Sequence, residues 1–274
     1  MSGIISPESG YLEVESGHLY YEVAGTGHPL LLVHADVADH RMWNEQFAAF
    51  AQRYRVIRYD KRGFGETTSE DVTFSPRQDI ADLLNHLGVE KTFILGLSNG
   101  GQLAIDFTLE RPELVAALIA AAAGVSGNPP SATEAEMQLI NTYITVQEQQ
   151  DVAGLIELGV RAWGDGPGQP EGRADVPVRE RLRAMMTNKY RNHHEHLDPR
   201  GLEPPAVERL GEIHVPTLVI VGDLDFSGTI TAMDLLAKRI VGARKIVFPG
   251  VAHMVNMEQP ERFNSVVLEF LGSL

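Results

Sequence analysis

Residues 92–101 read TFILGLSNGG, an apolar run that passes through a serine flanked by glycines into a helical pattern. This order of strand, sharp turn and helix is the context in which a nucleophilic serine stands above the end of a sheet. Gly96 and Gly100 leave room for the turn, the hydroxyl of Ser98 projects from it, and the backbone N–H groups that follow can face a developing oxyanion. The stretch therefore predicts a nucleophilic serine in an α/β protein.

Short apolar runs, each followed by loop signals and a helical pattern, recur along both flanks of the chain. Near-continuous apolar runs suit strands that are buried on both faces, and their alternation with helices predicts a parallel sheet with crossover helices. Residues 11–23 alternate around Ser16-Gly17 and predict a β-hairpin. The other predicted strands are residues 30–33, 55–59, 92–95, 115–122, 217–221 and 245–248.

Three helices have clear end signals. Ser75, Pro76 and Gln78 are typical of a helix N-terminus, and the apolar stripe that follows them stops at Gly88. A second helix is expected to follow Ser98 and to stop before Pro112, and the last helix is expected to start near Pro260.

The alternation breaks between about residues 128 and 212, where helical patterns occur without strand-like runs. A large insertion between two strands lies at an end of the sheet, where open α/β sheets bind ligands. We therefore expect residues 1–127 and 213–274 to form one core domain and residues 128–212 to form a helical cap, or lid, that shapes a pocket. The alternative is a peripheral helical decoration.

A serine hydroxyl is a poor nucleophile unless a neighbouring base accepts its proton. Where a nucleophilic serine stands on such a strand-turn-helix segment, the acid and then the histidine follow it in the chain. His253 lies in the loop after the last apolar strand, where a general base is expected. The strand before it runs into Gly222-Asp223-Leu224-Asp225, so Asp223 and Asp225 both qualify as the orienting acid, although Asp223 could instead form a turn.

Together these motifs resemble the α/β-hydrolase fold superfamily, in its capped, single-domain esterase and lactonase-like branch. The resemblance covers about residues 10–125 and 213–273, and it implies a mostly parallel central sheet flanked by helices with an inserted helical cap. It also implies that Asp225, not Asp223, is the acid. The matching residues are His34 with Trp43 beyond it, YDKRGFG at 59–65, GLSNGG at 96–101, the Gly222-x-x-Asp225 motif, and GVAHMVNMEQPE at 250–261.

The resemblance further implies an oxyanion hole made by two backbone N–H groups. One belongs to Asn99, and the other to Asp36, with Ala35 as the next candidate. Members of the family commonly have glycine at the position of Ala35, so this chain departs from the pattern. A carboxylate at Asp36 would oppose the developing negative charge unless it points away or is neutralised.

The implied activity is hydrolysis of a small ester or lactone. Ser98 attacks the carbonyl, His253 takes its proton, Asp225 orients the imidazole, and water then hydrolyses the acyl-enzyme. Hydrolases that cleave carbon–carbon bonds and perhydrolases remain alternatives, because they also use a serine on this fold. An alternative of another class is a small-ligand sensor with slow turnover.

Composition narrows the function classes further. The 37 acidic residues outnumber the 23 basic ones, and the net charge of −14 argues against nucleic acid and anionic membranes as partners. Without cysteine, disulfides and thiolate catalysis are excluded. We expect a cytoplasmic protein, because the first residues do not resemble a signal peptide and the apolar stretch 114–123 falls short of the ~20 residues of a spanning helix. Its partner is a small-molecule substrate, and its oligomeric state stays open.

Several other residues invite a functional interpretation. Ala35, Trp163 and Tyr143 are candidate pocket residues, although helical spacing is also typical of lid core for the two aromatic residues. The histidine-rich stretch 192–196 is interpreted as a solvated face because no second ligand cluster accompanies it. We therefore predict neither a metal site nor a cofactor.

Overall fold

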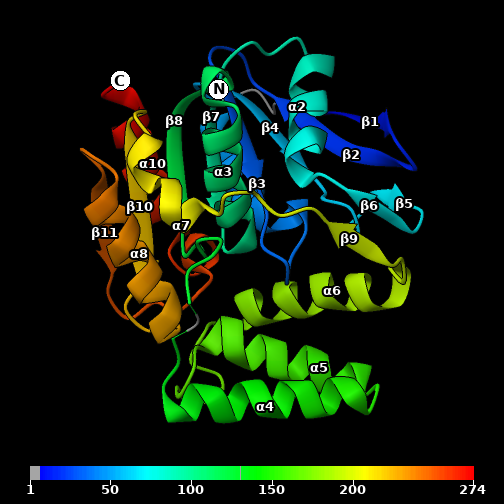
Figure 1. Cartoon of the computed structure of the whole chain (residues 1–274). Coiled ribbons are helices and arrows are strands. Elements are labelled where there is room, and N and C mark those ends of the chain that lie inside the picture. The colour runs from blue at the N-terminus through cyan, green and yellow to red at the C-terminus, as the bar shows by residue number, and fades with distance from the viewer. Residues whose placement is uncertain (1–6, 130) are drawn as a thin grey trace, which may run out of the picture.

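A computed structural model describes residues 7–129 and 131–274, and its centre is a nine-stranded sheet. The sheet contains β1 (Glu8–Val14), β2 (Gly17–Ala24), β3 (Pro29–Val33), β4 (Arg55–Tyr59), β5 (Thr68–Ser69), β7 (Thr92–Leu97), β8 (Val115–Ala121), β10 (Thr217–Gly222) and β11 (Arg244–Phe248). Their order is β1-β2-β4-β3-β7-β8-β10-β11, with β5 beside β2 (Figure 1). Only the pairings made by β2 are antiparallel, so the prediction of a mostly parallel sheet is confirmed.

Alternate residues of the central strands face two separate apolar layers. In β3, Leu30 and Leu32 belong to one layer, whereas Leu31 and Val33 belong to the other. The first layer contains side chains of α1 (Asn44–Phe50) and α10 (Pro260–Gly272), and the second contains those of α2 (Pro76–His86), α3 (Asn99–Glu110) and α8 (Ser227–Arg239). Because helices cover both faces, the central strands are continuous apolar runs and do not alternate with polar residues.

The expected helix ends are found where the end signals lie. Ser75 Oγ accepts a hydrogen bond from the Gln78 N–H at 3.2 Å, and Pro76 is the first residue of α2. Gly88 follows this helix with φ +65°, a conformation that glycine adopts at little cost. The short helices are η1 (His40–Trp43), η2 (Pro112–Leu114), η4 (Leu210–Glu212), α7 (Ala206–Arg209) and α9 (Val255–Glu258).

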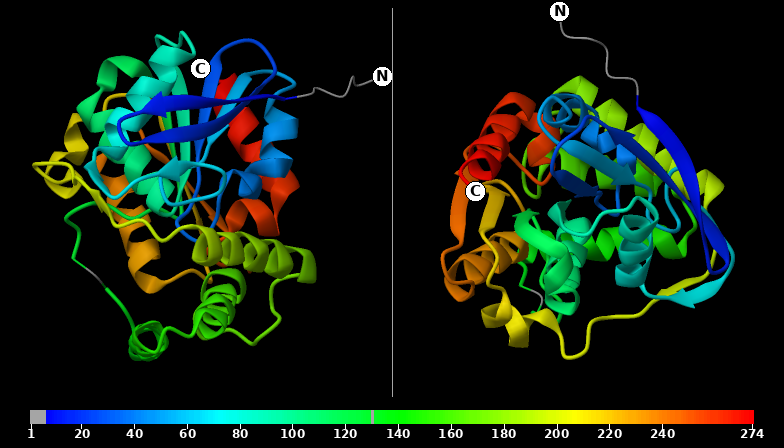
Figure 2. Two further views of the ribbon diagram at one scale, coloured as in Figure 1. Left: turned by 90° about the vertical axis from the view of Figure 1, so that its right-hand side faces the viewer. Right: turned by 90° about the horizontal axis from the view of Figure 1, so that it is seen from above.

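Between β8 and β10 the chain forms a layer of helices at one end of the sheet (Figures 1 and 2). These are α4 (Glu134–Glu148), α5 (Val152–Gly159), the π-helix η3 (Val160–Asp165) and α6 (Val176–Asn192). Thr133 and Glu136 form a capping box at the start of α4, and Glu136 also accepts a 2.6 Å hydrogen bond from the Ser227 N–H at the start of α8. One end of α4 is thus tied to the element that follows β10. No helix in the described ranges is long and apolar enough to cross a bilayer.

The segment 128–212 also contains a strand that the sequence pattern did not predict. β9 (Leu197–Pro199) pairs in parallel with β6 (Val72–Phe74) in a separate two-stranded sheet. Three residues are too few to show a period of two, and the pairing partner lies more than 120 residues away in the chain. β9 thus attaches the chain segment that follows α6 to the core of the protein.

Candidate active site

The turn at Ser98 has the geometry that its glycines predicted. β7 ends at Leu97 and α3 begins at Asn99, while Ser98 itself has φ 59° and ψ −124°, a strained conformation for a residue with a side chain. A Cβ on Gly96 would lie 2.1 Å from the carbonyl oxygen of Gly100, and one on Gly100 would lie 2.3 Å from that of Val33. Only glycine fits at both positions, so these residues allow the turn to bring Ser98 out at the strand end.

Hydrogen bonds join the carboxyl ends of four neighbouring strands. The Ser98 N–H donates to the carbonyl of Ala121 at the end of β8, at 2.9 Å, and the Asp223 N–H donates to that of Phe248 at the end of β11, at 3.1 Å. Between them, the N–H of Ala122 donates to the carbonyl of Ile220 in β10. The loops that carry the serine, the acid and the histidine therefore emerge from one edge of the sheet.

Asp225 and His253 are in direct contact at this edge. Nδ1 of His253 lies 2.8 and 3.0 Å from the two carboxylate oxygens of Asp225, and both side chains are buried. Because a carboxylate only accepts, Nδ1 carries the proton and the lone pair of the neutral ring is on Nε2. Nε2 is buried and has no hydrogen-bond partner among the described residues, Ser98 included. The hydrogen bond between a catalytic serine and its histidine is often long or absent without substrate. Nε2 is therefore a free acceptor at the site.

The two carboxylates after β10 have different partners. Asp223 Oδ1 accepts from the Gly250 N–H at 2.7 Å and so holds the turn after β11, as the alternative for Asp223 predicted. Asp225 reaches His253 because Gly222 lets the loops approach closely: a Cβ there would lie 2.1 Å from the carbonyl oxygen of Val251. The structure therefore brings Asp225, and not Asp223, to the histidine.

The candidate oxyanion donors lie in the loop after β3 and at the start of α3. The Ala35 N–H donates to Sδ of Met42 at 3.3 Å, whereas the N–H groups of Asp36 and Asn99 donate to no other group in the described part of the chain. The N–H of Ala35 is thus already hydrogen-bonded, whereas the N–H groups of Asp36 and Asn99 are available to bind an oxyanion.

The carboxylate of Asp36 is neutralised by a lysine that the sequence analysis did not single out. Lys61 Nζ donates to Asp36 Oδ1 at 2.5 Å and to the side-chain oxygen of Asn99 at 2.9 Å. From α6, Lys189 Nζ donates to the backbone carbonyl of Asp36 at 3.0 Å, and burial lowers the pKa of this ammonium although Asp36 partly opposes the shift. The ammonium groups of Lys61 and Lys189 lie over the ring of Phe64. The charge conflict expected at Asp36 is therefore resolved by tertiary contacts.

His34 connects the same loop to the loop after β4. Its Nε2 accepts from the Lys61 N–H at 3.0 Å, and its Nδ1 donates to the carbonyl of Ala35 at 2.7 Å. Burial, followed by the nearby Lys61 ammonium, lowers the pKa of His34 well below its usual value. The ring stays neutral and holds the two loops together.

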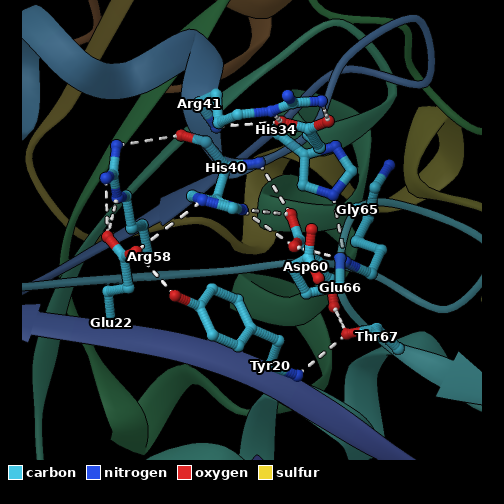
Figure 3. Close-up of polar contacts among 12 residues, drawn as sticks. Tyr20, Glu22, His34, His40, Arg41, Arg58, Asp60, Gly65, Glu66 and Thr67 are labelled. Carbon is cyan, nitrogen blue, oxygen red and sulfur yellow. Dashed lines mark hydrogen bonds and ion pairs between the residues drawn. The ribbon is translucent and has the colours of Figure 1, made fainter. Parts of the chain in front are cut away.

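A buried polar network supports the turn that carries Lys61 (Figure 3). Asp60 accepts from the His40 N–H at 2.7 Å, from His40 Nδ1 at 2.8 Å and from the Glu66 N–H at 2.9 Å. Asp39, which lies close enough to this pair to suggest a cation site, binds Arg41 through both oxygens. These donors and acceptors are occupied by the protein itself, so the cluster is a structural brace for the turn 60–65.

The candidate pocket residues Trp163 and Tyr143 pack against each other in the helical layer. Their rings meet edge to face at 5.6 Å, and the hydroxyl of Tyr143 is hydrogen-bonded to that of Tyr190 at 2.5 Å. Trp163 also approaches the ring of Phe226, the residue after Asp225. Ala35 is fully buried in the loop described above. A role of these residues in binding substrate stays a prediction.

The interpretation of residues 192–196 as a solvated face is wrong for His193. The side chain of His193 is only 7% exposed, and its Nε2 lies 3.1 Å from the carbonyl oxygen of Gly65. The end of α6 is therefore attached to the loop after β4. A sequence pattern of polar residues could not show this contact, because its partner is distant in the chain.

A cavity of about 210 Å³ lies between α2, α3 and β9, with Asn99 in its lining. Its lining includes the buried carboxyl of Asp106, which accepts from the Ser126 hydroxyl at 2.8 Å. Burial raises the pKa of Asp106 to about 6, and the bond from Ser126 partly opposes the shift. The cavity is lined by Asp36, Tyr59, Lys61, Arg62, Phe74, Pro76, Arg77, Asp79, Asn99, Gln102, Leu103, Asp106, Pro199, Arg200 and Gly201.

Replacing Asp106 by asparagine is expected to stabilise the fold at pH 8. The folded pKa of about 6 lies above the ordinary value of 3.8, so the folded state loses stability as the pH rises between these values. The full cost is present above pH 7, and the shift corresponds to at most about 3 kcal/mol. Urea denaturation should give Asp106→Asn a higher free energy of unfolding at pH 8 and little difference at pH 4. The exposed Glu113→Gln is the control, and equal gains at both pH values would contradict the assignment.

Comparison with known proteins identifies the class. Residues 30–266 match the model of the alpha/beta hydrolase family, and the chain belongs to this family. The architecture and the site agree with this membership, so the protein is a hydrolase.

Its relatives differ in the bonds that their names describe. The chain is 26% identical over 239 residues to 3-oxoadipate enol-lactonase 1 of Acinetobacter baylyi, covering 86% of this chain and 85% of that protein. It is 28% identical over 265 residues to the putative carbamate hydrolase RutD of Azorhizobium caulinodans, covering 93% and 96%. Among solved structures, a thermophilic esterase from Thermogutta terrifontis is 27% identical, with a TM-score of 0.77 and coverage of 97% of this chain and 98% of that one.

Proposed function

We propose that this protein is a serine hydrolase that cleaves a small ester or lactone through an acyl-enzyme on Ser98. The observation that carries the proposal is the state of His253. Asp225 binds its Nδ1, while its Nε2 is buried and unpartnered at the edge of the sheet from which Ser98 projects. A base that is oriented on one side and free on the other is what activation of a serine hydroxyl requires.

The steps follow from this arrangement. The Ser98 oxygen attacks the substrate carbonyl while His253 Nε2 takes its proton, and the N–H groups of Asp36 and Asn99 bind the resulting oxyanion. The imidazolium then protonates the leaving alkoxide, and the acyl-enzyme forms. His253 next removes a proton from water as the water oxygen attacks the acyl carbon. The imidazolium then returns this proton to the Ser98 oxygen as the acyl C–O bond breaks and the carboxylic acid leaves. Each backbone donor aimed at the oxyanion contributes about 3 kcal/mol to lowering the barrier.

Residues 128–212 act as the cap in this proposal. Their helices lie over the edge of the sheet that carries Ser98 and His253, and Lys189 and His193 of this segment contact the loops of the core. The cap then determines which acyl groups enter the site. The names of two relatives, an enol-lactonase and an esterase, support a carbonyl–oxygen bond as the bond that is cleaved.

Hydrolysis of a p-nitrophenyl ester series from acetate to decanoate, together with a panel of small lactones, tests the proposal. We expect turnover of the series, and the dependence of kcat/KM on acyl chain length reports the size of the substrate pocket. A fluorophosphonate should label the wild-type protein once, at Ser98, as read from peptide masses. Failure of both turnover and labelling would refute the proposal.

The same experiment separates the alternatives on this fold. Labelling of Ser98 without turnover of any ester or lactone would favour carbon–carbon hydrolysis, perhydrolysis or a ligand sensor. The carbon–carbon alternative would be followed by testing vinylogous diketones, whose cleavage is visible by absorbance. A sensor would bind a small ligand with little product formed.

A further inference from the structure

One ammonium group joins the two residues that carry the candidate oxyanion donors. Lys61 Nζ binds the side chains of Asp36 and Asn99, at 2.5 and 2.9 Å, although Asp36 lies in the loop after β3 and Asn99 begins α3, 63 positions further along the chain. The side chain of Lys61 is only 10% exposed, so its position is well defined by packing. Lys61 therefore connects the two segments that form the proposed oxyanion hole, the loop after β3 and the start of α3.

The backbone around these donors is held by separate contacts. The peptide that contains the Asp36 N–H has its carbonyl on Ala35, and this oxygen accepts from His34 Nδ1 at 2.7 Å and from the Ala38 N–H at 3.2 Å. On the other side of the residue, Lys189 binds the Asp36 carbonyl. These contacts orient the peptide plane, whereas Lys61 links the side chain of Asp36 to that of Asn99.

Charge gives Lys61 a second effect on the same site. The carboxylate of Asp36 is 48% exposed and belongs to the residue whose N–H faces the oxyanion. Without a cation, this carboxylate would repel the negative charge that develops in the transition state. The Asp36 carboxylate and the Lys61 ammonium form a pair without net charge. The dipoles of the N–H donors can then stabilise the oxyanion without an opposing negative charge.

We propose that Lys61 is a positioning residue for the oxyanion hole, which ties the Asp36 loop to Asn99 and neutralises the Asp36 carboxylate. This proposal rests on the proposed function, because it requires an oxyanion at Ser98. It assigns a catalytic consequence to the departure at positions 35 and 36, where the chain differs from the common pattern of its family.

The test compares the kinetics of Lys61→Met with those of the wild type on p-nitrophenyl acetate. Deleting an oxyanion donor lowers kcat by about 100- to 1000-fold, so misplacing the donors should cost less, about 10- to 100-fold. KM is expected to stay within about threefold, since the contact acts on the transition state. The rate of Ser98 labelling by the fluorophosphonate should fall in parallel with kcat.

The double variant Lys61→Met/Asp36→Asn tests the neutralising part of the role, because it lacks the lysine contact to Asn99 just as the single variant does. Removing the carboxylate that Lys61→Met leaves unpaired should restore kcat at least about threefold over the single variant. A lysine that served only stability would show no recovery, because deletion of its partner restores no packing. Lys245→Met removes a surface ion pair with Asp234, remote from the site, and should leave kcat unchanged.

Three results would overturn the proposal: a kcat of Lys61→Met within twofold of the wild type, a loss that appears in KM alone, or no recovery in the double variant. If Lys61→Met fails to fold, Asn99→Ala decides. This variant removes one arm of the contact from an exposed side chain and keeps the backbone N–H, so a loss in kcat of about 3- to 10-fold supports the proposal and an unchanged kcat refutes it.

Failure of the proposed function gives a different pattern. Ser98→Ala would then retain wild-type turnover, and both proposals would fall together. If Ser98→Ala abolishes turnover while Lys61→Met does not change kcat, only the role of Lys61 is refuted.

Discussion

Ser98→Ala is expected to lower kcat for p-nitrophenyl ester hydrolysis by at least about 10⁴-fold and to abolish fluorophosphonate labelling. The variant removes the attacking oxygen, so the acyl-enzyme cannot form. Remaining turnover would come from the oxyanion donors and from binding alone. Steady-state kinetics on the ester measure the first effect, and intact-protein mass after incubation with the fluorophosphonate measures the second.

The fold should tolerate this change. Ser98 already has a positive φ, and alanine meets about the same backbone strain there as serine. The melting temperature is therefore expected to stay close to that of the wild type. Ser265→Ala, at an exposed position of α10, is the matched control and should retain full activity. A residual activity above one-hundredth of the wild type, about 100 times the level expected, would show that another group is the nucleophile.

Asp225→Asn is expected to lower kcat by about 10³- to 10⁴-fold. In the wild type the carboxylate accepts the proton of His253 Nδ1, which leaves Nε2 as the acceptor. An asparagine amide can instead donate to Nδ1, and the ring then carries its proton on Nε2, where it cannot accept one from Ser98. The loss also includes the stabilisation of the imidazolium that forms in the reaction.

Asp223→Asn is a matched control for this variant, two residues away in the same loop. Asp223 contacts the Gly250 N–H and not the histidine, and an asparagine oxygen can keep that bond. We expect kcat within about threefold of the wild type for this variant, as for substitutions away from the reacting groups. Kinetics of the two variants side by side measure the difference, and a larger loss from Asp223→Asn would reverse the assignment of the acid.

The loop after β3 shows how this chain accommodates an unusual sequence at a sensitive position. The side chain at position 36 is a carboxylate next to a candidate oxyanion donor, and two lysines from different parts of the fold bind that residue. Lys61 binds the side chain and Lys189 binds the carbonyl. Because Lys189 belongs to α6, the geometry of this loop depends on where α6 lies.

Much of the architecture could be predicted from local pattern. The runs 30–33, 55–59, 217–221 and 245–248 all lie within observed strands. The continuous apolar sequence of 30–33 and 217–221 reflects the burial of these strands on both faces of the sheet. The end signals of α2 were equally local. β9 was not predicted, because its three residues form a strand only through pairing with β6.

The candidate site divides in the same way. Gly96, Ser98 and Gly100 were predicted from spacing, because the sharp turn excludes side chains by steric contact within one short segment. The pairing of Asp225 with His253 was expected from chain order and from the family resemblance. The neutralising role of Lys61 could not be expected in this way. A carboxylate at position 36 calls for a nearby cation, but the sequence does not specify which one.

The order of the main strands and helices and the position of the sharp turn at Ser98 could be inferred from local pattern, because both follow from contacts between residues close in the chain. Other contacts exist only in the packed fold: Lys61 joins Asp36 to Asn99, Lys189 of α6 binds the carbonyl of Asp36, and the side chain of His193 contacts the loop after β4. These contacts depend on how separate elements pack in space. Charge and hydrogen bonding act over a few ångströms of distance, whatever the separation of the partners along the chain.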